Sequence, residues 1–167
     1  MNKPGRKYPP EVTRQKMIAW CNKAERSQWD VRNRLMEWHI PATERENLIA
    51  ELISLGFLNE QRYASAFAHD KFTLNQWGEN KIRMHLKAKG ISERNINDAL
   101  KELSASESSD TIIRLIKKRS SALKGLQTWQ KKSKLMRYLL GKGFSQQQIA
   151  TELSKFFGTR DDEDPGL

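Results

Sequence analysis

Few side chains along this chain have the type and spacing that catalysis or metal binding requires. The single cysteine, Cys21, has no histidine near it in sequence to act as a base, so we expect a small buried apolar residue. His39, His69 and His85 stand far apart, and none has a His or Cys partner at metal-ligand spacing. The glycines are scattered singly and form no phosphate-cradling loop. The sequence therefore predicts no catalytic residue, no metal site and no cofactor, and it favours a binding module over an enzyme.

Positive charge is the chemical feature that does stand out. The formal net charge is +10, which predicts affinity for nucleic acid, a nucleoprotein assembly or the acidic face of a protein. Residues 111–151 contain ten Lys or Arg and no Asp or Glu, whereas residues 1–55 contain ten basic and seven acidic residues. Helices normally include acids that relieve like-charge repulsion through i,i+4 pairs, so their absence here favours an external anion over a merely solvated face.

Three predicted helices within residues 56–103 form the unit that organises the chain. The first starts at Asn59, whose side chain can cap it, and its apolar residues recur at steps of three and four. The second ends at Gly90, the residue best able to take the left-handed turn after a helix. The third begins after Ser92, with Asn95 as a weak capping-box partner. Each helix has one apolar face and needs neighbours to cover it.

Parts of this unit recur on both sides of it. Lys89-Gly90-Ile91-Ser92 is echoed by Lys142-Gly143-Phe144-Ser145, and a weaker echo surrounds Ile40. The period is about fifty residues, in the range that indicates tandem repeats. Tandem units contact mainly their neighbours, so we expect an elongated rather than a globular molecule.

Five segments follow from this repetition. A disordered basic arm at 1–10 precedes three-helix repeats at 11–55, 56–105 and 106–158, the last being the most basic, and an acidic disordered tail occupies 159–167. The Ser-rich stretch Ser104–Asp110 is predicted to be a break between repeats, with its last residues capping the next helix.

The compartment is predicted from what the chain lacks. One cysteine cannot form an internal disulfide, residues 1–10 do not resemble a signal peptide, and no stretch is long and apolar enough to span a membrane. We expect a cytoplasmic monomer with no membrane contact.

Four segments resemble the RecX family of regulatory proteins, in the order that the family has them. Gly56–Ala64 resembles its Gly-Tyr-Leu-Asp-Asp-Glu-Arg-Phe/Tyr-Ala signature, and Trp77–Ile91 resembles its Gly-x-x-x-Ile-x-x-x-Leu-x-x-Lys-Gly-Ile element. Glu25–Leu35 is similar to the family's Arg-Ser-x-x-x-Leu-x-x-Lys-Leu element, and Lys134–Ile149 to its closing Lys-x-x-x-x-Leu-x-x-Lys-Gly-Phe-Ser element. Phe57 departs from the usual Tyr and lacks its hydroxyl.

The resemblance implies an all-α fold: an elongated, curved right-to-left row of three tandem three-helix repeats. It also implies a regulator of the RecA recombinase in DNA recombination, DNA repair and the SOS response. Such proteins bind in the groove of the RecA–DNA filament and inhibit ATP hydrolysis, strand exchange and co-protease activity. The expected partners are the RecA filament and single- or double-stranded DNA. A direct DNA-binding helical protein without a RecA partner is the alternative, and a helical adaptor for another acidic protein is a third reading.

The candidate filament-binding residues are chosen by charge and helix face, not by a match to a functional motif. They are Arg32, Arg34, Arg83, Lys87 and Lys89 in the first two repeats, and Lys117, Lys118, Arg119, Lys131, Lys132, Lys134 and Arg137 in the third.

Overall fold

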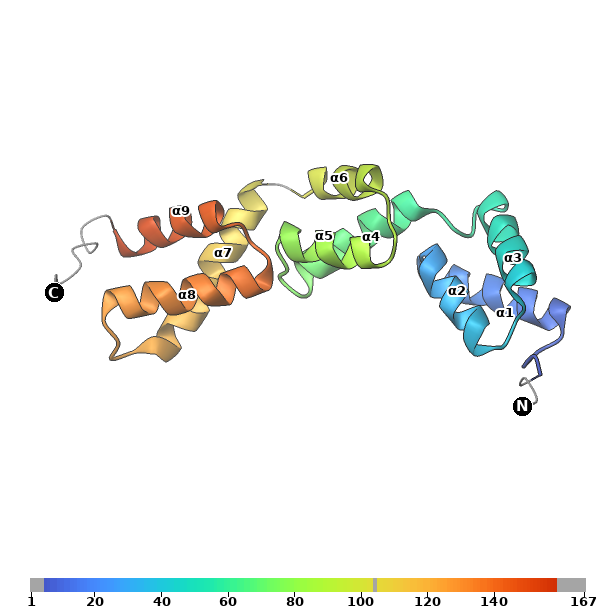
Figure 1. The fold of residues 1–167 in the computed structure, drawn as a ribbon. Coiled ribbons are helices and arrows are strands. Elements are labelled where there is room, and N and C mark those ends of the chain that lie inside the picture. Colours follow the sequence, from blue (N-terminus) through green and yellow to red (C-terminus); the bar gives the residue numbers. More distant parts are fainter. Residues whose placement is uncertain (1–4, 104, 159–167) are drawn as a thin grey trace. The chain divides into compact units, whose positions relative to one another are not determined.

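The computed structural model describes residues 5–103 and 105–158, and its regular elements in these ranges are all helical (Figure 1). No strand is present in the described ranges, so the predicted all-α fold class is confirmed. The elements are α1 (Pro10–Lys23), α2 (Gln28–Glu37), α3 (Ala42–Ser54), α4 (Glu60–Thr73), α5 (Glu79–Ala88), α6 (Glu93–Lys101), α7 (Ala105–Ser120), the 3-10 turn η1 (Ser121–Leu123), α8 (Thr128–Lys142) and α9 (Gln146–Phe157). Among the residues described, no helix has the length and apolar character needed to cross a membrane.

The chain divides into two compact units. The first comprises Met1–Ala66 with Leu86–Ala99, and the second comprises Phe67–His85 with Leu100–Leu167. Helices α1–α3 belong wholly to the first unit and α7–α9 to the second, whereas the division passes through α4, α5 and α6. The repeat boundaries drawn from the sequence stay a prediction.

Helices α1–α3 bury one apolar stripe each in a shared core, because residues three and four apart lie on one helix face. The buried hydrophobic residues of these helices are Met17, Cys21, Val31, Leu35, Ile49 and Leu52. Cys21 is a free thiol, and burial raises its pKa, as expected for a small apolar core residue rather than a nucleophile. Ile53 is exposed although its apolar character predicts burial, because it follows the buried Leu52 and projects about 100° around the helix from it.

Helices α7–α9 enclose a hydrophobic core of their own within the second unit. Its buried members are Ile112, Leu115, Ile116, Leu135, Leu139, Phe144, Ile149 and Leu153. Gly143 ends α8 with φ of +97°, a left-handed conformation that favours glycine. Ser145 then caps α9 in a capping box with Gln148, so a turn of only three residues joins the two helices.

The start of α5 lies against the end of α8. The Gly78 amide donates to the Lys142 carbonyl at 2.9 Å, and the Asn80 amide donates to the Gly143 carbonyl at 3.0 Å. A Cβ at Gly78 would overlap the backbone of Gly143, so only glycine allows this approach.

The Ser-rich stretch is helical, and the predicted break is wrong over residues 105–110; Ser104 lies outside the described residues. Helix α7 begins at Ala105, well before the predicted cap. Ser108 and Thr111 are buried, and the Ser109 hydroxyl donates to Glu152 Oε1 on α9 at 2.7 Å. Packing against α9 outweighs the modest helix propensity of serine.

The N-terminal segment is held in place from residue 5 onward. The Lys7 amide donates to the Trp38 carbonyl at 2.9 Å, and the Tyr8 ring packs edge-on against Trp38 with 5.0 Å between ring centroids. The expected disordered arm is therefore wrong for residues 5–10. Residues 1–4 and the predicted acidic tail at 159–167 lie outside the described residues.

Candidate polyanion-binding surface

The predicted cations on α2 are engaged within the protein. Arg32 Nε and Nη2 donate to the two carboxylate oxygens of Glu46 on α3, at 2.7 and 2.8 Å. The guanidinium of Arg34 lies 4.8 Å from the centroid of the Trp20 ring, and its Nε is 3.8 Å from Glu37. A bidentate pair such as Arg32–Glu46 must be broken before the arginine can bind a phosphate.

Lys89 occupies a partly buried position in the first unit. Its Nζ lies 2.6 Å from Asp30 Oδ1, and 5.2 and 5.4 Å from the ring centroids of Trp29 and Tyr63. Burial is the largest single influence on both pKa values and opposes charge on both partners, but their mutual hydrogen bond, the further hydrogen bond of Lys89 to Tyr63 and those of Ser27 to Asp30, and the attraction between the charges together outweigh it. The pKa of Lys89 is therefore raised and that of Asp30 is lowered, the latter with help from Ser27. This ion pair fastens Lys89 to the capping box of α2.

The two remaining predicted cations of the middle repeat lie on α5. Lys87 is exposed and forms an ion pair with Glu93 at the start of α6. Arg83 is half-buried.

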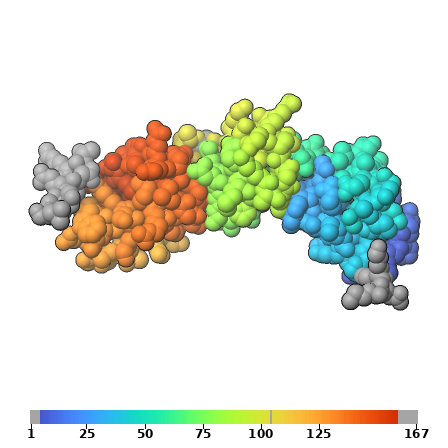
Figure 2. All heavy atoms as spheres, in the orientation of Figure 1, coloured from blue at the N-terminus to red at the C-terminus, as the bar shows by residue number. Residues whose placement is uncertain are grey.

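The cations of α7 and α8 have a more open setting. Lys117, Lys118 and Arg119 are exposed in the last turn of α7, where positive charge is also favoured by the helix dipole. On α8, Lys134 and Arg137 are exposed, whereas Lys131 and Lys132 are half-buried. In Figure 2 the orange atoms, which include those of α8, lie on the visible surface of the second unit.

The structure separates the α8 cations into two groups. Lys131, Lys134 and Arg137 follow one another at i+3 steps, and Tyr138, which contacts Arg119 of α7, lies beside them. The guanidinium of Arg119 is 5.4 Å from the Tyr138 ring centroid. Lys132 lies elsewhere and lines a hollow of about 290 Å³ between α8 and α9. We call Arg119, Lys131, Lys134 and Arg137 the α7–α8 basic surface.

The α7–α8 basic surface lacks acidic partners. No carboxylate of residues 5–103 or 105–158 lies within ion-pair distance of these four cations. Such uncompensated charge attracts an anion from solution and makes its binding salt-dependent.

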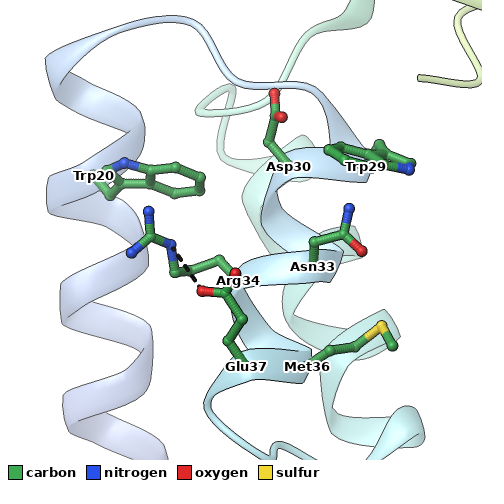
Figure 3. Close-up of a pocket in the computed structure, with 7 residues that line it drawn as sticks. All are labelled: Trp20, Trp29, Asp30, Asn33, Arg34, Met36 and Glu37. Atoms are coloured by element: carbon green, nitrogen blue, oxygen red, sulfur yellow. Dashed lines mark ion pairs between the residues drawn. The ribbon is translucent and has the colours of Figure 1, made fainter. Parts of the chain in front are cut away.

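A hollow between α1 and α2 had no signal in the sequence, because it depends on how the two helices pack. Its volume is about 520 Å³, and Figure 3 shows Trp20 of α1 and Trp29 of α2 on either side of it. Trp29 and Met36 are 47% and 50% exposed, which is high for such large apolar side chains. The other lining residues are Asp30, Asn33, Arg34 and Glu37.

The histidines and acids of the described residues form no cluster of three or more that could hold a metal ion. His85 instead packs against Trp77, with 4.6 Å between ring centroids.

The helices of the described residues define a class, the small all-helical proteins. Two family models narrow the class further. The model of the second three-helix domain of RecX matches residues 59–100, and the model of the third matches residues 106–151. Together they span just over half of the 167 residues, and they confirm the predicted three-helix repeats there. The chain belongs to the RecX family.

Curated relatives agree with this assignment. Regulatory protein RecX of Clostridium perfringens (strain 13 / Type A) is 29% identical over 124 residues, which are 73% of this chain and 58% of the relative. Regulatory protein RecX of Bacillus cytotoxicus is 26% identical over 145 residues, 87% of this chain and 54% of the relative. The chain thus spans roughly half the length of these relatives.

Solved structures show the same fold. The crystal structure of RecX from Lactobacillus salivarius matches with a TM-score of 0.79 at 22% identity, covering 89% of this chain and 96% of that one. A second crystal structure of regulatory protein RecX matches with a TM-score of 0.78, also at 22% identity, over 86% of this chain and 70% of that one.

Proposed function

We propose that this chain binds the RecA–DNA filament and inhibits or modulates RecA ATP hydrolysis, strand exchange and co-protease activity. Membership of a family whose curated members are named regulatory proteins supports this role. The protein would act as a cytoplasmic monomer in DNA recombination and repair and in the SOS response. It needs no catalytic residue or cofactor of its own, because RecA hydrolyses the ATP.

The α7–α8 basic surface is the observation on which this proposal depends. A filament of protein and DNA presents closely spaced phosphates, and exposed cations without acidic partners bind phosphates by displacing condensed counterions. Long-range attraction by a chain of net charge +10 also speeds encounter at low salt.

The predicted contact residues differ in whether an internal ion pair must open before they can bind the filament. The exposed cations of α7 and α8 can meet a filament without giving up an internal ion pair, and we assign them the main role in binding. Arg32, Lys87 and Lys89 already pair with acids, so binding through them would require those ion pairs to open. These three residues, and Arg34 and Arg83, would contribute less.

Titration of RecA ATPase tests the proposal. Lys134→Glu/Arg137→Glu reverses two exposed charges of the α7–α8 basic surface and should shift inhibition to higher protein concentration. Arg94→Glu/Lys124→Glu is the matched control, because it changes net charge equally at two other exposed positions. Thermal unfolding by circular dichroism checks that both variants stay folded.

Two outcomes contradict the proposal. If the wild-type protein leaves RecA ATPase unchanged, RecA regulation is wrong. If both double variants inhibit equally, the assignment of filament binding to α7 and α8 is wrong.

Direct DNA binding without a RecA partner is the second candidate, because the same uncompensated cations would also attract bare DNA. Binding to single-stranded DNA and to a preformed RecA filament, measured at matched salt, separates the two functions. Equal affinity for both ligands favours direct DNA binding, and a clear preference for the filament favours RecA regulation.

A further inference from the structure

A second hollow in the first unit adjoins the one in Figure 3 and shares Trp20 and Arg34 with it. Its volume is about 290 Å³. The α1 residues on its wall lie at i, i+3, i+4 and i+7, which places them on one helix face. The wall contains three aromatic rings and three cations: Tyr8, Trp20 and Trp38, and Lys16, Lys23 and Arg34.

The lining of this aromatic–cationic hollow includes no carboxylate, whereas Asp30 and Glu37 line its neighbour. Within the described part of the chain, Lys16 and Lys23 form no ion pair. Lys16 Nζ instead lies 4.8 Å from the centroid of the Tyr8 ring. Charge and aromatic surface are therefore adjacent, and no internal acid neutralises Lys16 or Lys23, whereas Arg34 pairs with Glu37 at 3.8 Å.

A ligand that matches this lining has a flat apolar part and a negative charge beside it. An unpaired nucleotide has both, because its base can pack on an aromatic ring while its phosphates meet lysines. In a duplex the base faces are covered by stacking, so a duplex offers only its phosphates. An acidic protein segment would match the charge but would leave the rings unused.

We propose that the aromatic–cationic hollow holds an unpaired nucleotide of single-stranded nucleic acid, with the base against the indole ring of Trp38 and the flanking phosphates near Lys16 and Lys23. The base is assigned to Trp38 because the guanidinium groups of Arg26 and Arg34 already lie over the Trp20 ring. This goes beyond the proposed regulation of RecA, since it predicts binding to bare single strands through the first unit. It requires neither RecA nor the α7–α8 basic surface.

Ala19 offers a way to close the hollow without changing charge. It lies exposed in the lining, and leucine there adds bulk while remaining a good helix former. Ala50→Leu is the matched control, because Ala50 is an exposed alanine on α3 of the same unit, outside the hollow. Binding of a labelled oligo(dT) should weaken at least about fivefold in Ala19→Leu, the effect of removing one base–aromatic stacking interaction. Ala50→Leu should bind as the wild type does.

Two further ligands distinguish binding of the base from binding of the phosphates. Fluorescence anisotropy measures the affinity for each ligand. Ala19→Leu should not change the affinity for an abasic oligonucleotide or for a duplex of equal length. Lys16→Gln/Lys23→Gln should weaken both single-stranded ligands and lower the slope of log affinity against log salt by about 1.4, at about 0.7 for each phosphate that is no longer neutralised.

The proposal is overturned if Ala19→Leu and Ala50→Leu bind oligo(dT) equally, or if Ala19→Leu weakens the abasic strand as much as oligo(dT). It is also overturned if poly-glutamate displaces oligo(dT) as readily as unlabelled oligo(dT) does, since an acidic protein would then be the better match. Because RecA is absent from these assays, their outcome is independent of the ATPase titration.

Discussion

Asp30 joins the cap of α2 to Lys89 in the first unit. Its carboxylate accepts hydrogen bonds from the Ser27 amide and hydroxyl, at 3.0 and 2.8 Å, and from Lys89 Nζ at 2.6 Å. It therefore caps α2 and neutralises a cation that is only 25% exposed. Removing its charge would leave Lys89 partly buried without a counter-charge.

Asp30→Asn should lower the free energy of unfolding by about 1–3 kcal/mol, the usual cost of leaving a buried polar partner unsatisfied. Urea unfolding followed by circular dichroism measures this change. Lys89→Met in the Asp30→Asn background is the control, since removing both partners leaves no unpaired charge. If the losses in free energy of unfolding caused by Asp30→Asn and Lys89→Met are simply additive, the ion pair contributes nothing to stability.

The same carboxylate makes stability depend on pH. Interactions in the folded state lower the pKa of Asp30 below its ordinary value of 3.8. The stabilisation is therefore fully present above pH of about 4–5 and is lost as pH falls through the folded pKa, because the unfolded chain takes up the proton first. Urea midpoints measured from pH 5 to pH 2 should fall more steeply for the wild type than for Asp30→Asn. Parallel curves would contradict this assignment.

Helix ends were predictable where the signal is local. Asn59 Oδ1 accepts from the Arg62 amide at 2.9 Å, Ser92 Oγ accepts from the Asn95 amide at 3.3 Å, and Gly90 has φ of +76°, as the sequence predicted. The start of α7 was missed because it depends on packing against α9, which is 43 residues away at the Ser109–Glu152 hydrogen bond. Helix propensity describes an isolated segment, whereas tertiary packing determines where a helix such as α7 begins.

The candidate sites divide in the same way. The excess of cations in residues 111–151 was visible in the sequence, since it needs only counting. Which cations pair internally was not visible, because Arg32 meets Glu46 through the packing of α2 on α3. The hollows between α1 and α2 were likewise hidden, since the residues that line the aromatic–cationic hollow range from Tyr8 to Trp38.

Glycines at element boundaries allow a matched stability test. Gly78→Ala should destabilise strongly, by several kcal/mol, because its methyl group would overlap the backbone at Gly143 and Phe144. Gly141→Ala should instead stabilise by up to about 0.5–1 kcal/mol, because it lies in α8 with open space around its Cα. Thermal unfolding of both variants measures the difference, and equal effects would contradict the close approach.

The whole molecule combines high net charge with an uneven distribution of acids. Its +10 charge predicts that binding to any polyanion weakens as salt rises. The slope of log affinity against log salt should be smaller for Lys134→Glu/Arg137→Glu than for the wild type, by about 0.7–0.9 for each phosphate that the variant no longer neutralises. The affinity of both proteins for the filament, measured at several salt concentrations between about 50 and 200 mM, gives the two slopes. An unchanged slope would place the phosphate-binding residues elsewhere.

The contact between the end of α8 and the start of α5 affects how the second unit unfolds locally. The amides of Gly78 and Asn80 point to the last carbonyls of α8, at Lys142 and Gly143, so two helix ends that would otherwise need water or side chains satisfy each other. Fraying of one helix must therefore release the other. Deuterium should enter Gly78 and Asn80 at the rate at which the end of α8 opens, which makes these two amides reporters on a helix to which they do not belong.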